Sequence, residues 1–513
     1  NFTDVGDECV IDILDFGVMV GEFGNDYPNP GADPTLPTGP NTPCGVVGPH
    51  ADCTGDGVVS IADFTFVASL FLLQCDPDCC EMSPALAGGG RSDISVEELY
   101  RLGMGELAIA DLNDDGRLNV LDMIEFMNGA RPVRQASFTG ADGASWFDSA
   151  NWSNGRRPDL FTDVTLARQV LVDQLGAEAR HVTVEADGHL WLLDGGLTAT
   201  SLTVHAGGVL QLDGSSILSL ESLTLEAGAS LVWNGGVLEI AGGTYSQDDL
   251  DLLVGTSNVL STLSLIEGAT ASIAEHTYIG LNQGNLGQIE VDGGSSLFTG
   301  GSLYVGFGGE GTLLVSNGGL VSSQDGTLGF LPGSYGEAVV SGAGSVWSTL
   351  VDLQVGGEGV GRLTVTEGSL VISPTLGVGR LGEVLGDGVV QSDVTSDGVV
   401  HGGLLIDGGY VQTVGGTLAV RLGETLQVTG VADLSGTLSI ELPEQPIEVG
   451  DSWTILTADA IAGGFDSIAL PDLGAGASLE VSYGADSVTV TVRGTRQILS
   501  PTAPSSDRFE TRR

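Results

Sequence analysis

Oxygen-bearing side chains recur at regular spacing between residues 111 and 122. The segment places them at positions 1, 3, 5, 9 and 12 of a twelve-residue loop, with glycine at position 6. The residues concerned are Asp111, Asn113, Asp115, Asn119 and Asp122, with Gly116 at the turn and Arg117 offering its backbone carbonyl at position 7. Calcium binds six to eight hard oxygen ligands, and an EF-hand loop supplies them at this spacing. The sequence therefore predicts a Ca²⁺ site here.

A second copy of the pattern spans residues 52–63. Its expected ligands are Asp52, Thr54, Asp56, the Val58 carbonyl, Ser60 and Asp63. Each loop leads directly into an apolar stretch, residues 64–73 in the second copy and 123–127 in the first, which predicts a helix after each loop. We expect calcium in this loop as well.

A third copy opens the chain and departs from the pattern. The corresponding positions hold Asp4, Glu8, Val10, Asp12 and Asp15, but Gly6 stands at position 3 and Cys9 replaces the turn glycine. Fewer side-chain oxygens and a strained turn favour a calcium-free helix–turn over a metal site. Metal binding at this weaker loop is left open.

Paired loop–helix segments ending in Asp resemble the dockerin modules of secreted bacterial proteins. This resemblance implies calcium binding and a cohesin domain as partner. The two complete loops start 59 residues apart (111 − 52), whereas dockerin loops are closely spaced. The intervening residues include Cys75–Cys80 and a helix-like stretch at 95–102.

The chain is strongly acidic. Its formal net charge is −50, from 67 acidic and 17 basic residues, and all the basic residues are arginine. Nucleic acids and anionic membranes depend on basic patches for binding, so we expect neither nucleic-acid binding nor membrane insertion. Self-repulsion on this scale favours conditions in which salt or divalent cations screen the charge.

Six cysteines lie within the first eighty residues, and none follows. They are Cys9, Cys44, Cys53, Cys75, Cys79 and Cys80. Beside calcium loops they favour disulfides over zinc, in an oxidising exterior, although the connectivity stays open. The chain shows no start methionine, signal region or apolar span of eighteen residues, so we expect a mature, secreted protein at the cell surface.

The larger part of the chain repeats with a period of about 25 residues. Landmark valines stand at Val291, Val315, Val340 and Val365. A second apolar track follows at Leu297, Val321, Val346 and Val371, and a third contains Val305-Gly306, Leu328-Gly329, Val355-Gly356 and Val378-Gly379. Three short alternating strands per repeat, separated by turn residues, predict the rungs of a parallel β-solenoid rather than a β-sandwich array.

The ends of such a solenoid need caps because they expose unpaired strands. Residues 146–158, with Trp146 and Trp152, are suited to the first cap, and the pattern changes near residue 424. Residues 280–495, with segments such as Gly450-Asp-Ser-Trp-Thr-Ile-Leu and Leu479–Val492, resemble autotransporter passenger β-helices. The resemblance implies an extracellular rod with an adhesive or structural role.

These patterns predict a mainly β fold with a small helical calcium-binding module. The expected organisation is a disulfide-containing module at 1–135, a linker and cap at 136–165, the solenoid at 166–424, a β cap at 425–495 and a flexible tail at 496–513. Histidines scattered over different repeat tracks, at His181, His189, His205, His276 and His401, and acids at turns argue against an enzyme.

Three functions remain from these observations. The first is a calcium-stabilised structural or adhesive surface protein that self-associates into filaments or a surface layer, or binds another surface protein or glycans. The second is a dockerin-type module that binds a cohesin partner. The third is a polysaccharide-active β-helix enzyme, the class to which many parallel β-helices belong.

Overall fold

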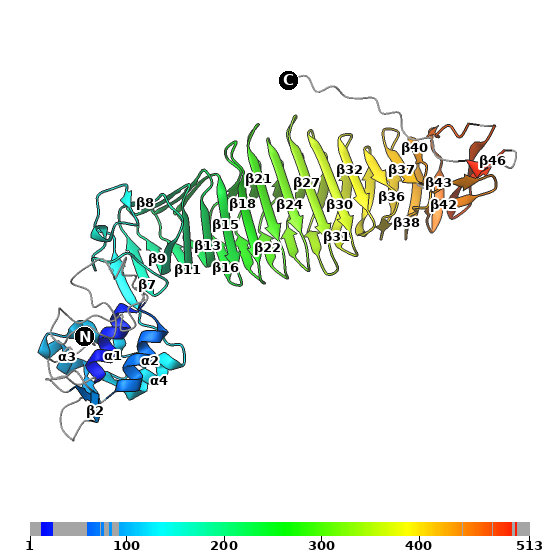
Figure 1. The fold of residues 1–513 in the computed structure, drawn as a ribbon. Helices are drawn as coiled ribbons and strands as arrows, with labels where there is room; N and C mark the ends of the chain where they lie inside the picture. The colour runs from blue at the N-terminus through cyan, green and yellow to red at the C-terminus, as the bar shows by residue number, and fades with distance from the viewer. Residues whose placement is uncertain are drawn as a thin grey trace. The chain divides into compact units, whose positions relative to one another are not determined.

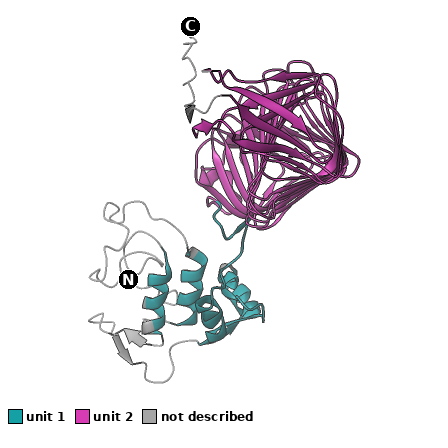
Figure 2. Ribbon diagram, turned by 90° about the vertical axis from the view of Figure 1, so that its right-hand side faces the viewer, with its two compact units in different colours: residues 1–136, 158–163 teal, residues 137–157, 164–513 magenta. Residues whose placement is uncertain are grey.

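The computed structural model describes residues 12–23, 59–71, 73–75, 82–84, 92–443, 445–474, 476–494 and 498–499. The chain divides into two compact units (Figure 2). Unit 1 comprises residues 1–136 and 158–163, and unit 2 comprises residues 137–157 and 164–513. Strands β5 (Arg134–Ser137) and β7 (Thr162–Leu166) each cross the boundary between these residue sets.

The described part of unit 1 is mainly helical. It contains α1 (Ile13–Glu22), α2 (Ile61–Leu70), α3 (Val96–Leu102), the 3₁₀ helix η1 (Gly105–Ala110) and α4 (Val120–Met127). Two short antiparallel pairs accompany them, β1 (Leu73–Cys75) with β2 (Met82–Pro84) and β3 (Asp93–Ser95) with β4 (Arg117–Asn119).

Three phenylalanines hold the helices of unit 1 together. The ring centroids of Phe16 on α1 and Phe64 on α2 lie 6.0 Å apart, and those of Phe64 and Phe126 on α4 lie 5.0 Å apart. All three side chains are buried in one cluster with Leu99 of α3. Burial of such side chains contributes about 1.5–3 kcal/mol each, so the helices after the loops share one core.

Unit 2 is a parallel β-solenoid, which confirms the predicted fold class. It makes about 13 turns with a rung of about 23 residues. Its strands stack side by side along the solenoid (Figure 1), and Figure 2 views the same unit along its length. Parallel strands lie about 4.8 Å apart, so the ladder is on the order of 60 Å long.

Each rung contributes strands to three ladders, called A, B and C. Ladder A contains β9 (Ala177–Val184), β11 (Gly196–Val204), β13 (Ile217–Leu225), β15 (Gly236–Ala241), β18 (Ser261–Ile266), β21 (Leu286–Val291), β24 (Glu310–Val315), β27 (Tyr335–Ser341), β30 (Val360–Thr366), β32 (Gly382–Gly386), β34 (Val399–His401), β37 (Thr417–Arg421), β40 (Thr437–Glu441) and β44 (Ser467–Ala469).

Ladder B begins in the second halves of β9, β11 and β13. It continues through β16 (Thr244–Gln247), β19 (Thr270–Ile273), β22 (Ser296–Thr299), β25 (Leu320–Ser323), β28 (Val346–Thr349), β31 (Leu370–Val378), β33 (Val389–Ser396), β35 (Leu405–Ile406), β38 (Leu426–Val428) and β42 (Ser452–Thr457).

Ladder C begins as a separate five-stranded sheet of β6 (Ala144–Ser145), β8 (Gln169–Val172), β10 (His189–Leu193), β12 (Val209–Asp213) and β14 (Ser230–Asn234). It continues through β17 (Leu252–Val254), β20 (Thr277–Ile279), β23 (Leu303–Val305), β26 (Gly326–Leu328), β29 (Asp352–Val355), the second halves of β31 and β33, β36 (Tyr410–Gln412), β39 (Val431–Leu434) and β43 (Ala460–Gly463).

The register of the strands confirms the first and third repeat tracks. Val291, Val315, Val340 and Val365 align on successive rungs and are completely buried. The second track was wrong at one position, because Val321 aligns with Trp347 rather than Val346. The turn before Trp347 is one residue longer than its neighbours, and in a strand a shift of one residue moves the side chain to the other face.

A glycine corner follows ladder C and brings successive rungs into close contact. A Cβ atom added to Gly336 would lie 2.0 Å from the Val305 carbonyl oxygen, and one added to Gly306 would lie 2.1 Å from that of Tyr335. Gly306 also has a φ of 70°, in the region that favours glycine. The recurrent glycines therefore permit backbone contact between rungs at this corner.

Aromatic residues close the first rung of unit 2. Trp146 and Trp152 are buried with ring centroids 4.8 Å apart, and the Trp152 indole donates to the Trp146 carbonyl oxygen at 2.8 Å. The 3₁₀ helix η2 (Ser149–Asn151) connects them. The segment expected to cap the solenoid thus lies beside β6, where the stack of ladder C begins.

At the other end, the parallel ladder changes to antiparallel pairing. Strand β42 pairs with β46 (Ser487–Arg493), which in turn pairs with β45 (Ser478–Tyr483). A further short pair joins β41 (Ile447–Glu448) to β47 (Ile498–Leu499). The hairpin β45–β46 covers an edge that would otherwise present unpaired backbone groups.

Candidate functional site

The predicted calcium loop at 111–122 lies between η1 and α4. Its residues 117–119 form β4, which pairs with β3 so that Leu118 aligns with Ile94. Leu118 is completely buried and Ile94 nearly so, and both belong to the core of unit 1. The C-terminal half of the loop is therefore held by a strand pair, by the apolar packing of Leu118 and by the first turn of α4.

The first half of the loop turns its polar side chains inward. The Asp111 carboxylate accepts hydrogen bonds from the backbone N–H of Gly116, at 2.9 Å, and of Asp115, at 3.2 Å. Asn113 Oδ1 accepts from the Asp115 N–H at 3.0 Å, and Asp115 Oδ1 accepts from the Arg117 N–H at 2.9 Å. Gly116 has a φ of 80°, as the sharp turn at position 6 requires.

Asp122 closes the loop from its far end. Its side chain is completely buried, and one carboxylate oxygen accepts from the Leu112 N–H at 2.8 Å while the other accepts from the Asn119 N–H at 2.8 Å. Asn119 in turn caps α4, since its side chain accepts from the Leu121 N–H at 2.7 Å. The last loop position is thereby connected to the first residues of the loop.

The loop gathers negative charge. Burial raises the pKa of Asp111, and the carboxylates of Asp122 and Asp115 raise it further, while hydrogen bonds from the Gly116 and Asp115 backbone lower it. A carboxylate oxygen has more than one lone pair, so a backbone hydrogen bond leaves it able to bind a cation. A divalent cation among these oxygens would offset the mutual repulsion.

The fit of these residues to calcium rests on the loop rather than on a preformed cluster. Among the residues that the structure describes, no group of three or more His, Cys, Asp or Glu side chains is arranged as a metal cluster. The Arg117 guanidinium forms an ion pair with Asp93, at 2.6 Å, and takes no part in the loop interior. Asp111, Asn113, Asp115 and Asp122 would supply side-chain oxygens, and the roles of the Arg117 carbonyl and Asn119 stay predictions.

Only the last residues of the other two predicted loops lie within the described residues. In the second loop, Ser60 caps α2 and its N–H donates to the buried Asp63 at 2.8 Å. In the weaker loop, the Asp12 N–H donates to the buried Asp15 at 2.7 Å. The other expected ligands lie outside the described residues: Asp52, Thr54, Asp56, Val58, Asp4, Glu8 and Val10. The cysteines expected to form disulfides also lie there, except for the backbone of Cys75 in β1.

These three helices begin with the same capping box. The residue at loop position 9 accepts a hydrogen bond from the helix, and the Asp at position 12 accepts from the backbone of that residue. Each cap contributes about 1 kcal/mol. The three helix starts therefore share one local geometry.

A related helix start, which the sequence reasoning did not connect to the loops, begins α3. Ser95 caps this helix by accepting from the Glu98 N–H at 3.2 Å, and β3 pairs with β4 of the calcium loop. The available signal was the match of Ile94-Ser95-x-x-Glu98-Leu99 to Leu118-Asn119-x-x-Asp122-Met123. In the sequence, the residues that would match loop positions 1, 3 and 5 are Ala87, Gly89 and Arg91, which offer no carboxylate or side-chain carbonyl oxygen.

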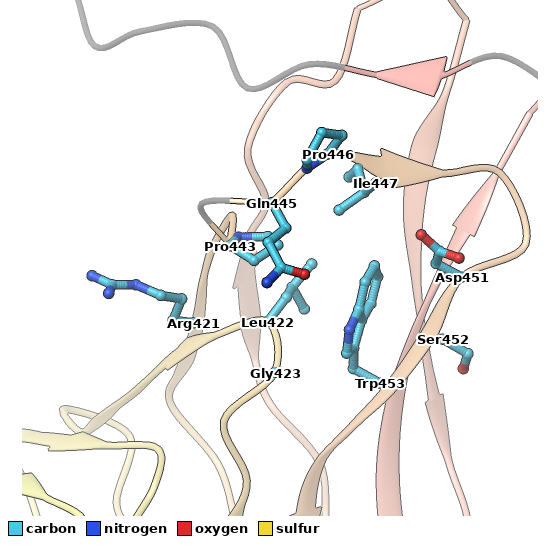
Figure 3. Close-up of a pocket in the computed structure, with 10 residues that line it drawn as sticks. All are labelled: Arg421, Leu422, Gly423, Pro443, Gln445, Pro446, Ile447, Asp451, Ser452 and Trp453. Atoms are coloured by element: carbon cyan, nitrogen blue, oxygen red, sulfur yellow. The ribbon is translucent and has the colours of Figure 1, made fainter.

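Unit 2 has a hollow of about 730 Å³ where the parallel ladder meets the cap (Figure 3). Trp453, Leu422 and Gln445 point into it, whereas Arg421 points away. The remaining lining residues are Gly423, Pro443, Pro446, Ile447, Asp451 and Ser452. The Asp451 carboxylate accepts a hydrogen bond from the Glu448 N–H at 2.7 Å. It therefore stabilises the turn between β41 and β42.

Histidines on the solenoid contact polar side chains on neighbouring rungs. His205 lies 2.9 Å from Glu226, and this carboxylate raises the pKa of the His205 imidazole. His401 lies 2.8 Å from Glu383, and His181 Nδ1 lies 2.6 Å from the Ser201 hydroxyl. These three contacts join side chains of adjacent rungs.

Aromatic side chains on ladder C and at the glycine corner after it are the second feature that sequence reasoning missed. Tyr278 and Tyr304 stack with ring centroids 5.0 Å apart, and Phe307 and Phe330 do the same beside them. The signal was their recurrence at two neighbouring repeat positions, in Tyr278-Ile-Gly-Leu281, Tyr304-Val-Gly-Phe307 and Thr327-Leu-Gly-Phe330.

Comparisons with known proteins assign no function to these sites. Within the described part of the chain, no helix has the length and apolar character needed to span a membrane. No protein-family model matches the chain, and the searches of curated proteins and of solved structures found no significant match.

Proposed function

We propose that this chain is a secreted, calcium-stabilised surface protein with a structural or adhesive role. The observation that carries the calcium part is the closed loop at 111–122, in which Asp111, Asn113 and Asp115 turn inward and Asp122 joins the two ends. Within this loop, Leu118 packs in the core and Asn119 caps α4. Bound calcium would therefore stabilise the helices of unit 1.

The structural part is supported by the regularity of the solenoid. Its rungs bury a continuous apolar interior and pair backbone along three ladders, so each rung is stabilised only by its neighbours. A stiff stack of this kind suits a protein that presents a surface at a distance. The net charge of −50 makes screening by divalent cations favourable for assembly.

Calorimetry with electron microscopy tests this proposal. The melting transition of unit 1 is expected to shift upward in millimolar calcium relative to EDTA, because calcium binds the folded loops. Negative-stain images with and without calcium should show rods, and assemblies of rods in calcium. Equal melting temperatures would refute the calcium role, and rods that stay monomeric in calcium by light scattering would refute assembly.

A second candidate function is docking of a cohesin-like partner through α4. Four of its apolar side chains are 46–68% exposed: Val120, Leu121, Ile124 and Met127. An exposed apolar helix face beside a calcium loop is typical of helix-mediated recognition. Pull-down with cohesin domains tests this, and an I124S/M127S double variant should abolish capture while calcium binding is retained.

A further inference from the structure

The stacked phenylalanines that follow the glycine corner after ladder C end at Phe330. The residues that follow the glycine corner on successive rungs are Leu281, Phe307, Phe330 and Gly357. The backbone hydrogen bonds confirm this order, since Phe330 N–H donates to Gly306 and Gly357 N–H donates to Gly329. A glycine therefore stands where a third stacked ring would lie.

A hollow occupies the place of the missing ring. Its volume is about 270 Å³, and it is lined by Thr327, Phe330, Leu331, Gln354, Gly357 and Glu358. One face of the Phe330 ring is covered by Phe307, with the two rings 13° from parallel, and the Phe330 side chain is still 37% exposed. The hollow thus offers an aromatic surface to a ring from outside.

The rim of this hollow is polar. Thr327 and Gln354 align on adjacent strands of ladder C and point outward, and Glu358 is exposed on the next turn. A hydroxyl, an amide and a carboxylate can together donate to and accept from groups around the edge of a ring. An aromatic side chain would fill the hollow but leave these groups without partners, whereas a pyranose presents an apolar face and a hydroxyl edge.

We infer that this hollow binds one pyranose ring of an uncharged glycan, stacked on Phe330 and held at its edge by Thr327, Gln354 and Glu358. Binding sites of this kind combine an aromatic surface with a few oriented polar groups. The Glu358 carboxylate and the net charge of −50 disfavour glycans that carry carboxylates or sulfates. The inference rests on the adhesive part of the proposed function, for which it supplies a ligand class.

Affinity electrophoresis of the full chain in native gels tests this site. The gels contain neutral polysaccharides (a β-glucan, a mannan, a galactan and glycol chitin) or acidic ones (alginate and polygalacturonate). Retardation by at least one neutral polysaccharide and by neither acidic one is the expected result. Retardation by none of the neutral polysaccharides would overturn the inference, as would equal retardation by the acidic ones.

Two substitutions locate the site. F330A removes the stacking surface and should weaken retardation roughly tenfold. G357F fills the hollow with the missing ring and should weaken it as strongly. The matched controls are F298A, which removes a 50% exposed phenylalanine from ladder B, and G357A, which adds only a Cβ atom 3.2 Å from the Gly329 oxygen.

The outcomes separate this inference from the proposed function. Wild-type retardation that persists in both F330A and G357F would place glycan binding elsewhere and overturn the inference. If G357F instead abolishes self-association in sedimentation experiments, with no glycan effect, the hollow takes a side chain of a second copy. The calcium shift of the melting temperature, measured on the same samples, reports on unit 1 and does not depend on this hollow.

Discussion

At the scale of single residues, carboxylates in this protein differ in what surrounds them. Asp122 is buried and accepts backbone hydrogen bonds at both oxygens. Asp397 accepts from the Thr413 hydroxyl and the Arg380 guanidinium, whereas Asp352 lies beside another carboxylate, that of Asp325. An ionised aspartate therefore stabilises the fold where its neighbours donate hydrogen bonds and destabilises it where its neighbour is another carboxylate.

The calcium loop gives a prediction at two of its aspartates. D111N removes a charge from loop position 1 and should lower the number of tightly bound calcium ions by one, because a charged oxygen ligand is lost. D114N changes the same functional group at position 4, where no ligand is expected, and Asn tolerates the φ of 54° found there. Isothermal titration calorimetry measures both. Equal stoichiometry and affinity for wild type and D111N would contradict the assignment.

At neutral pH, the ionised carboxylates of two solenoid aspartates are predicted to affect stability in opposite directions. Burial and the hydrogen bond and charge of Asp325 raise the pKa of Asp352, so its ionisation costs stability at neutral pH, a cost relieved as pH falls through the raised pKa. Hydrogen bonds from Thr413 and Arg380 lower the pKa of Asp397, so its contribution is present at neutral pH and lost as pH falls through the lowered pKa.

Melting temperatures of the wild type and of the two Asn variants, recorded between pH 3 and pH 7, test this prediction. At neutral pH, D352N should melt above wild type and D397N below it, and both differences should shrink in acid. The same direction of change for both variants at neutral pH would contradict the electrostatic account, since each substitution removes one negative charge from the same solenoid.

At the scale of elements, alternation within a strand decides what each side chain contributes. In β27, Val340 is completely buried while Val339 points outward between the same neighbouring strands. The two valines share a strand, a ladder and a residue type. Only the face differs.

V340A is therefore expected to cost about 2 kcal/mol, since it leaves a cavity between two rungs. V339A is the matched control, and its cost should stay within about 0.5 kcal/mol. Guanidinium unfolding of the two variants measures the difference. Similar midpoints for both would show that the interior of the solenoid adapts to the loss.

At the scale of the whole molecule, the ends of the solenoid determine whether it stays a single rod. The buried tryptophans at Trp146 and Trp152 close the first rung, and the hairpin β45–β46 covers β42 at the last. Interior rungs need no such device because each is covered by two neighbours. The caps are the places where the repeat ends and other contacts replace it.

A chain shortened after residue 470 should self-associate end to end, because it lacks β45 and β46 and exposes the edge of β42. A chain that lacks only residues 500–513 is the control. Light scattering at increasing concentration, in EDTA to exclude calcium bridging, measures the mass. A shortened chain that stays monomeric would show that the hairpin is not needed to protect this edge.

Much of this architecture could be predicted because its signals are local. The spacing of oxygen-bearing residues in 111–122 lies within one loop, and alternation of apolar residues lies within one strand. The 25-residue period of the valines predicted the stack, since a short strand with one apolar face can bury it only against copies of itself. The rung of about 23 residues is shorter on average because the end rungs contract, with Leu190 aligned to Leu210 and Leu418 to Leu438.

The sequence by itself therefore determined the repeating unit and its fold class, and the calcium ligands stay predictions. Only the tertiary structure decided which side chains meet across rungs, such as Trp347 instead of Val346 in the interior, Asp352 beside Asp325, and Phe330 over Gly357. The physical reason is register. Residues on adjacent rungs are separated by several turns, and one extra residue in a turn changes which side chains of the next strand face the interior.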